Sequence, residues 1–208
     1  MEPLTFIFIG RSGCGKGTQV KLLQDYLVEH DTSGRDIFYL ETGARFREFI
    51  AKDSHTSMLS KKINEEGALQ PEFLAVRTWA DEFVENYSGK EHVIIDGTPR
   101  KIREAHVLDG AIRFYNLKQP HVIYLDISRE ESKKRLMKRG RADDREESDV
   151  EKRLNWFDTD VVPVIEFFRD NSYYNFTSIV GEQSVEDIHK EVIKKVFGGI
   201  PNDILKID

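Results

Sequence analysis

A glycine-rich stretch near the start of the chain constrains what this sequence can fold into more than any other feature. It runs Gly-Arg-Ser-Gly-Cys-Gly-Lys-Gly-Thr-Gln over residues 10–19. An apolar run at 4–9 precedes it and predicts a buried strand, and the apolar residues after it are spaced as on one helix face. Strand, glycine-rich turn, Gly-Lys and helix form the context in which a loop binds phosphate.

The physical chemistry of this loop favours an anion. Gly10, Gly13 and Gly15 lack a Cβ atom, so the backbone can curl tightly and approach a ligand closely. The N–H groups then form a nest at the positive end of a helix, and Lys16 adds a point charge. One detail departs from the general motif, because Gly17 stands between the lysine and the usual hydroxyl residue.

Composition limits the class of protein. The 208 residues suit one α/β domain, with 39% hydrophobic and 33% charged residues. A net charge of −6 gives no support to nucleic-acid or membrane-surface binding, and no apolar run approaches the ~20 residues that span a bilayer. Because the chain has a single cysteine, Cys14, no internal disulfide can form, which is typical of a reducing compartment such as the cytoplasm. The first residues also lack the basic start of a secretory signal, so we expect a cytoplasmic protein. Cys14 either fills a tight turn or has a redox role.

Strand patterns alternate with helix patterns along the chain. Short apolar runs, two of which end in aspartate, are typical of strands buried on both faces of a parallel sheet. We therefore predict an α/β fold, a doubly wound five-stranded parallel sheet with helices on both faces. The expected strands are 4–9, 37–40, 92–95, 121–126 and 175–180, and the expected helices are 71–87, 101–117, 129–138, 146–169 and one that begins after Ser184. Pro163 should kink or break the long fourth helix.

Two segments do not fit a plain repeat of strand and helix. Residues 42–70 hold two short, weakly apolar helical patterns, and residues 139–147 are almost entirely polar. Polar excursions at the ligand end of a sheet are candidates for moving covers. Residues 200–208 have the composition of a loose tail.

Arginines follow the strand ends. Arg47 lies just past the second strand and Arg100 just past the third, on the rim that carries the phosphate loop. A further set surrounds the polar segment: Arg135, Arg139, Arg141 and Arg153. So many arginines aimed at one cleft of an acidic protein predict two phosphorylated substrates, end to end. The expected chemistry is phosphoryl transfer, which needs positioning and charge neutralisation and no nucleophilic side chain.

Several motifs occur in a characteristic order. They are Gly-Lys-Gly-Thr-Gln at 15–19, Thr-Gly-x-x-x-Arg at 42–47, Gly-x-Leu-x-Pro at 67–71, Asp-Gly-x-Pro-Arg at 96–100, Arg-x-x-x-Arg at 135–139, Asp-Asp at 143–144 and Arg153. Together they resemble the adenylate kinase family of nucleoside monophosphate kinases, P-loop proteins, over nearly the whole chain. The resemblance implies one domain over 1–208, with a core of 1–41, 71–138 and 148–208, a helical monophosphate-binding insertion at 42–70 and a very short lid at 139–147.

The resemblance also implies roles for individual residues. ATP would be held by Gly13, Cys14, Gly15, Lys16, Gly17, Thr18, Arg135 and Arg139. The monophosphate would be held by Thr42, Gly43, Arg47, Asn64, Leu69, Gln70, Gly97, Arg100, Glu104, Arg141 and Arg153. The catalytic set would be Lys16, Arg100, Arg135, Arg141 and Arg153. Mg²⁺ would bind through water and phosphates near Thr18 and Asp96, whereas the lid lacks the Cys or His cluster of a zinc site.

The expected reaction is ATP + AMP = 2 ADP, carried out by a monomer, but the acceptor pocket departs from the family. At the position of Glu104 the family has a glutamine that hydrogen-bonds adenine. At the position of Thr98 the family has a phenylalanine, and at the position of Gln70 a valine is common. An ionised carboxylate only accepts hydrogen bonds, whereas an amide also donates. AMP remains the expected acceptor, with CMP, dCMP or UMP as alternatives. A nucleotide-binding regulatory protein without efficient turnover is the alternative from another class, and a GTPase switch lacks its Asn/Thr-Lys-x-Asp motif.

Overall fold

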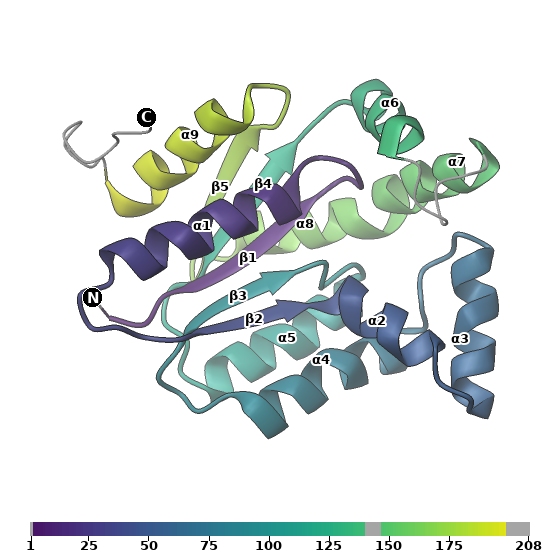
Figure 1. Ribbon diagram of the computed structural model, residues 1–208, viewed down its shortest axis with the longest axis horizontal. Helices are drawn as coiled ribbons and strands as arrows, with labels where there is room; N and C mark the ends of the chain where they lie inside the picture. The colour runs from purple at the N-terminus through teal and green to yellow at the C-terminus, as the bar shows by residue number, and fades with distance from the viewer. Residues whose placement is uncertain (1, 140–146, 199–208) are drawn as a thin grey trace.

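The computed structural model describes residues 2–139 and 147–198. At its centre lies a sheet of five parallel strands in the order β2-β3-β1-β4-β5 (Figure 1). The strands are β1 Thr5–Gly10, β2 Ile37–Glu41, β3 His92–Asp96, β4 His121–Asp126 and β5 Asn175–Val180. The five predicted strands are confirmed, with bounds within one residue of those expected. Placing β1 in the middle puts the glycine-rich loop at the centre of the carboxyl edge.

Helices cover both faces of the sheet, as the alternating pattern predicts. Helices α1 (Lys16–His30) and α9 (Val185–Phe197) pack on one face. The other face carries α4 (Glu72–Asn86), α5 (Ile102–Phe114) and α8 (Val162–Asp170). Successive residues of β1 point to opposite faces, so Phe6 and Phe8 join the first core while Ile7 and Ile9 join the second. The fold is therefore the doubly wound α/β architecture.

Four further helices lie beyond the carboxyl ends of the strands. The insertion at 42–70 contains α2 (Thr42–Ile50) and α3 (His55–Glu65), as its two short patterns predict. Helix α6 (Arg129–Arg139) packs on α7 (Glu147–Trp156) through a small apolar cluster of Leu136, Val150 and Leu154. Within the described ranges, no helix has the length and apolar character needed to cross a bilayer.

The predicted long helix at 146–169 is helical throughout its described residues, but a π-helical turn interrupts its α-helical geometry before the proline. A π-helical turn, η2 (Phe157–Val161), follows α7 directly, and α8 then begins at Val162. Pro163 lies in the first turn of α8, where its missing N–H costs no helical hydrogen bond. The helix therefore changes from α-helical to the wider π-helical geometry just before the proline. Helix α8 then begins with Pro163 at a tolerated position. The buried side chains of Phe157 and Val161 fix this turn against the core.

Candidate active site

A large cleft of about 1240 Å³ opens at the carboxyl end of the sheet. The glycine-rich loop and α1 form its floor, and the ends of β2 and β3 form one side. The segment at 64–70 and the side of α7 that faces the cleft form the opposite side. Segments far apart in the sequence thus line one cleft. Because β1 is the central strand, the loop that follows it lies at the middle of this edge, where a doubly wound sheet binds its ligands.

The glycine-rich loop is tightly wound around Lys16. The Lys16 Nζ atom donates to the carbonyl oxygens of Gly10 at 2.8 Å and Arg11 at 3.2 Å, which holds the ammonium group against the loop. A Cβ atom on Gly10 would lie 2.6 Å from the Leu125 carbonyl oxygen and 2.7 Å from Cys14 Sγ, so no larger residue fits there. The side chain of Cys14 is buried in the core beneath the loop, in agreement with the role of filling a tight turn.

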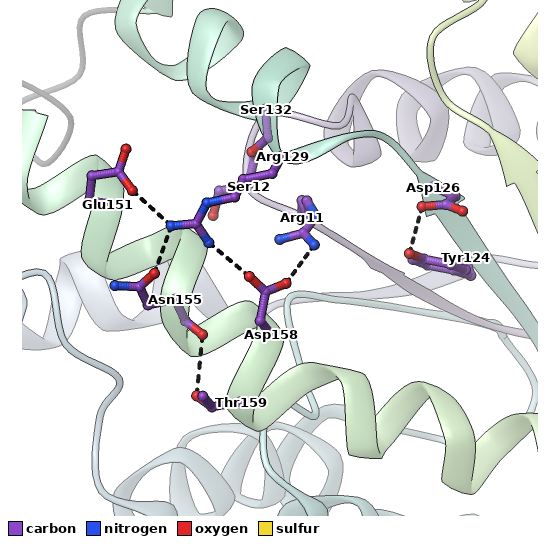
Figure 2. A network of polar contacts seen from close by, with 10 residues as sticks. All are labelled: Arg11, Ser12, Tyr124, Asp126, Arg129, Ser132, Glu151, Asn155, Asp158 and Thr159. Atoms are coloured by element: carbon purple, nitrogen blue, oxygen red, sulfur yellow. Dashed lines mark hydrogen bonds and ion pairs between the residues drawn. The ribbon is translucent and has the colours of Figure 1, made fainter.

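A polar network anchors this loop from outside the cleft (Figure 2). Arg11 donates to Asp158 of the π-helical turn at 2.5 Å, and Arg129 at the start of α6 donates to the other oxygen of Asp158 at 2.8 Å. The Ser132 hydroxyl of α6 donates to the Ser12 carbonyl at 2.7 Å. The loop, α6 and η2 are therefore fixed relative to one another by side chains that the cleft itself does not use.

Arg47 reaches the acceptor side of the cleft from α2. Its Nη2 atom donates to Glu41 Oε1 at 2.7 Å, and both residues line the cleft. Thr42, between them in sequence, is 3% exposed, and its hydroxyl oxygen has no hydrogen-bond partner among the residues that the structure describes. A buried hydroxyl beside the cleft is thus available to a polar atom of a ligand.

Arg100 follows β3 and enters the same cleft. Its Nε atom donates to the Gly97 carbonyl at 2.8 Å, and its Cζ atom lies 5.5 Å from the centre of the Trp156 ring. The backbone N–H of Arg100 donates to Glu104 Oε2 at 2.9 Å, and the Thr98 hydroxyl donates to the same oxygen at 3.5 Å. One carboxylate oxygen of Glu104 is therefore committed to the turn that carries Arg100.

Glu104 is 3% exposed, yet it lines the cleft. Burial raises the pKa of this carboxyl above its ordinary value, while the N–H and guanidinium of Arg100 act in the opposite direction. The net effect raises the pKa, so the protonated form of Glu104 is favoured more than that of an exposed glutamate. The carboxyl group would accept hydrogen bonds when ionised, and would also donate one when protonated.

Asp96 and Thr18 fit a magnesium ion held through water. Asp96 is 8% exposed, and its Oδ1 atom has no hydrogen-bond partner in the described part of the chain. Burial raises the pKa of Asp96, and the charge of Lys16 lowers it. Thr18 is exposed and lines the cleft on α1. Residues 2–139 and 147–198 contain no cluster of three or more His, Cys, Asp or Glu side chains that could hold a metal directly.

The cleft brings together most of the residues that the sequence predicts as ligands. The predicted residues that line it are Gly13, Gly15, Lys16, Gly17, Thr18, Thr42, Gly43, Arg47, Asn64, Leu69, Gln70, Gly97, Arg100, Glu104, Arg139 and Arg153. Of the predicted residues that the structure describes, Cys14 and Arg135 do not line it, and Arg135 instead pairs with Glu131 at 2.7 Å. Arg141, Asp143 and Asp144 lie outside the described residues, as does most of the predicted lid.

Gln70 lines the cleft with its amide group already engaged. Its Nε2 atom donates to the Ser60 carbonyl at 2.9 Å, and its Oε1 atom accepts from the Ser60 hydroxyl at 2.8 Å. Both ends of the amide therefore hold the 64–70 turn to α3. This contact gives Gln70 a structural role in the insertion.

Sequence reasoning missed several residues of the cleft, among them Glu41 and Trp156. Glu41 forms the end of β2, directly before the Thr-Gly motif, and this position alone could have identified it. Trp156 is the last residue of α7 and lines the cleft. The residues next to it in the sequence show only a helical pattern, which does not indicate a ligand contact.

Comparison with known proteins agrees with this geometry. The family model described as adenylate kinase matches residues 8–173. The chain is 30% identical to adenylate kinase 1 of Nostoc sp. over 89% of this chain and 95% of that protein. It is 29% identical to an adenylate kinase of Bacteroides fragilis over 93% of this chain and 98% of that protein. An adenylate kinase of Corynebacterium aurimucosum is 28% identical, with 92% and 98% of the two chains covered.

Proposed function

This chain belongs to the adenylate kinase family and is a phosphotransferase acting on nucleoside monophosphates, and we propose that it transfers the γ-phosphoryl group of ATP reversibly to AMP. One observation carries the proposal. Lys16 of the glycine-rich loop and the strand-end arginines Arg47 and Arg100 line a single cleft. That cleft offers cationic groups at both ends of the path along which a phosphoryl group would move.

The donor end of the reaction is assigned to the loop. The backbone N–H groups of residues 13–18 hold the β- and γ-phosphates of ATP at the amino end of α1, and Lys16 contributes its charge there. Asp96 and Thr18 would hold Mg²⁺ through water, and the ion would neutralise charge on the triphosphate. Because these groups are fixed beforehand, they stabilise the transition state without reorganising during the reaction.

The acceptor end is assigned to the arginines. Arg47 and Arg100 bind the phosphate of the monophosphate, since the fixed fork of a guanidinium matches phosphate oxygens. Arg139 and Arg153 line the cleft between the two ends and gather around the transferring group. Arg135, which pairs with Glu131 on α6, would have to leave that pair to support the donor nucleotide, and Arg141 would act from the predicted lid. Closure of the segments at 42–70 and 139–147 excludes water, which would otherwise hydrolyse the triphosphate.

The acceptor base is assigned to the pocket around Thr42 and Glu104. Thr42 offers a buried hydroxyl, and Glu104 accepts a hydrogen bond from an exocyclic amine. Adenine carries such an amine next to a ring nitrogen that needs a donor, which the protonated form of Glu104 provides. The named relatives are adenylate kinases, and this favours AMP.

A second candidate acceptor is CMP or dCMP, because of Glu104. Cytosine also presents an exocyclic amine to an accepting carboxylate, whereas uracil presents an oxygen at that position. The ionised form of Glu104 therefore opposes UMP and permits CMP. AMP and CMP differ mainly in base size, which the turn at 64–70 limits.

The organisation of the protein is part of the proposal. Residues 1–41, 71–138 and 148–208 would form the core, with 42–70 as the monophosphate-binding segment and 139–147 as a short lid. We infer a cytoplasmic monomer, since one chain supplies residues for both substrates.

A panel of acceptors tests the proposal. Purified protein is incubated with Mg-ATP and, separately, with AMP, CMP, dCMP, UMP and GMP, and the diphosphate products are quantified. We expect the highest kcat/KM with AMP. A higher value with CMP or dCMP would replace AMP by the second candidate. Binding of nucleotides without turnover of any acceptor would instead indicate a regulatory protein.

A further inference from the structure

Trp156 joins two parts of the cleft that come from different segments. Its indole Nε1 atom donates to the Gly67 carbonyl oxygen at 3.3 Å, at the end of the segment that covers the acceptor. The face of its ring lies 5.5 Å from Arg100 Cζ. Trp156 itself is half-buried and lines the cleft at the end of α7. A single side chain thus contacts both the segment at 42–70, here called the acceptor cover, and the arginine expected to bind the acceptor phosphate.

The turn at Gly67 is built to receive this contact. Gly67 has a φ angle of +68°, which side chains rarely adopt, and a Cβ atom there would lie 3.5 Å from the backbone of Asp149. Lys152, one turn before Trp156, donates to the carbonyl of Glu66 at 2.9 Å. Helix α7 therefore holds two successive carbonyl groups of the cover at 66 and 67.

Arg100 is fixed from two sides. The Gly97 carbonyl accepts a hydrogen bond from its Nε atom, and its Cζ atom lies over the Trp156 ring. A cation held over an indole face is attracted by the ring electrons, and tryptophan is the strongest such partner among the aromatic side chains. The stack uses the face of the guanidinium, whereas phosphate oxygens would bind at its edge.

We propose that Trp156 is a positioning residue that aligns Arg100 with the acceptor phosphate when the turn at 64–70 is closed. The contact with Gly67 places the indole, and the indole face then orients the guanidinium. Closing the cover and orienting Arg100 become one event. This inference rests on the proposed function, because it takes the monophosphate to be the ligand of Arg100.

The inference predicts an effect confined to the acceptor. In Trp156→Leu, an apolar side chain remains, but both the ring face and the N–H group are lost. We expect kcat/KM for the monophosphate to fall about tenfold or more, with the KM for ATP within twofold of wild type. Trp156→Phe keeps a ring face and loses the N–H group, so the loss should be about threefold.

Lys152→Ala serves as the matched control on the same helix. It removes the neighbouring contact with the cover at Glu66 and leaves the indole and Arg100 in place. We expect it to change kcat/KM for the monophosphate less than twofold. Far-UV circular dichroism and melting temperatures of all three variants verify that each one folds. A loss in Lys152→Ala equal to that in Trp156→Leu would assign the effect to the cover alone and overturn the inference.

Tryptophan fluorescence gives a readout that does not depend on turnover. The chain has two tryptophans, and the other, Trp79, is buried in the core at 2% exposure. We expect AMP alone to change the emission of the wild-type protein, ATP alone to change it much less, and Trp156→Phe to abolish the AMP response while calorimetry still detects AMP binding. An AMP response that persists in Trp156→Phe would overturn the inference.

The two readouts separate this inference from the proposed activity. Normal turnover combined with an unaffected Trp156→Leu would leave the activity standing and refute the positioning role. An AMP-dependent change in Trp156 emission without transfer to any acceptor would support the contact and refute the activity.

Discussion

Glu41 and Arg47 form an ion pair inside the acceptor half of the cleft, with 2.7 Å between Glu41 Oε1 and Arg47 Nη2. The pair joins the last residue of β2 to the last turn of α2, so it spans the start of the acceptor cover. Glu41 thereby occupies the guanidinium edge that the account assigns to the acceptor phosphate. A phosphate and this carboxylate compete for one arginine.

Replacing Glu41 should therefore strengthen acceptor binding. In Glu41→Gln, the phosphate no longer displaces a carboxylate, and we expect the KM for the monophosphate to fall about two- to fivefold, since exposed pairs are worth little. Initial-rate kinetics at saturating ATP measure this. Glu48→Gln is the control, because Glu48 pairs with Arg45 at the surface. A raised KM in Glu41→Gln would show that the pair holds Arg47 in place for the phosphate.

A change at Glu104 should alter the choice of base. Glutamine at this position offers both a donor and an acceptor, which matches the amine and ring nitrogen of adenine together. We expect Glu104→Gln to raise kcat/KM for AMP about tenfold relative to the wild-type protein. The acceptor panel measures the ratio. Equal preferences in the two proteins would remove Glu104 from the base pocket.

The use of AMP should depend on pH through the same residue. Because burial raises the pKa of Glu104, lowering the pH toward that pKa protonates the carboxyl, which then donates to the adenine ring nitrogen. We expect the ratio of wild-type to Glu104→Gln kcat/KM for AMP to rise as the pH is lowered toward the raised pKa of Glu104. Taking the ratio cancels titration of the substrate and of Asp96. A flat ratio would contradict a titrating Glu104.

His92 should make the fold sensitive to acid. Its ring is fully buried, Nδ1 accepts the Leu4 N–H at 3.1 Å, and burial lowers the pKa of the imidazole. The unfolded state then binds the proton first, so stability is complete above the ordinary pKa of about 6.5 and declines as pH falls below it. Each proton contributes a slope of about 1.4 kcal/mol per pH unit.

Urea unfolding between pH 4 and pH 8 measures that slope. His92→Gln keeps a polar side chain that does not titrate, and we expect the slope below pH 6.5 to decrease by up to one proton. His121 and His189, whose pKa values burial also lowers, contribute to the slope that remains. An unchanged slope in His92→Gln would mean that His92 is protonated in the folded protein.

Much of the architecture follows from local patterns in the sequence. The apolar runs at 92–95 and 121–126 predicted strands because a doubly buried strand needs continuous apolar residues. Ser184 predicted a helix start, and its hydroxyl accepts the Asp187 N–H at 3.1 Å. These features depend on a few neighbouring residues, so they can be found without a structure.

The cleft was predictable only where a motif marks it. Lys16, Arg47 and Arg100 stand beside glycine turns at strand ends, and all three line the cleft. Trp156 contacts a partner 89 residues away, which no local pattern specifies. The π-helical turn at 157–161 was also missed, because Pro163 indicated a break but not on which residues it would fall.

The central claim, that one cleft passes a phosphoryl group between two nucleotides, is tested most directly by the stoichiometry of the reaction. Purified protein receives equal amounts of Mg-ATP and AMP, and ATP, ADP, AMP and phosphate are quantified together over time. We expect two ADP for each ATP consumed, no phosphate release, and loss of transfer by a factor of about 10²–10³ or more in Lys16→Ala with the fold retained. Release of phosphate without AMP phosphorylation, or full activity in Lys16→Ala, would contradict that claim.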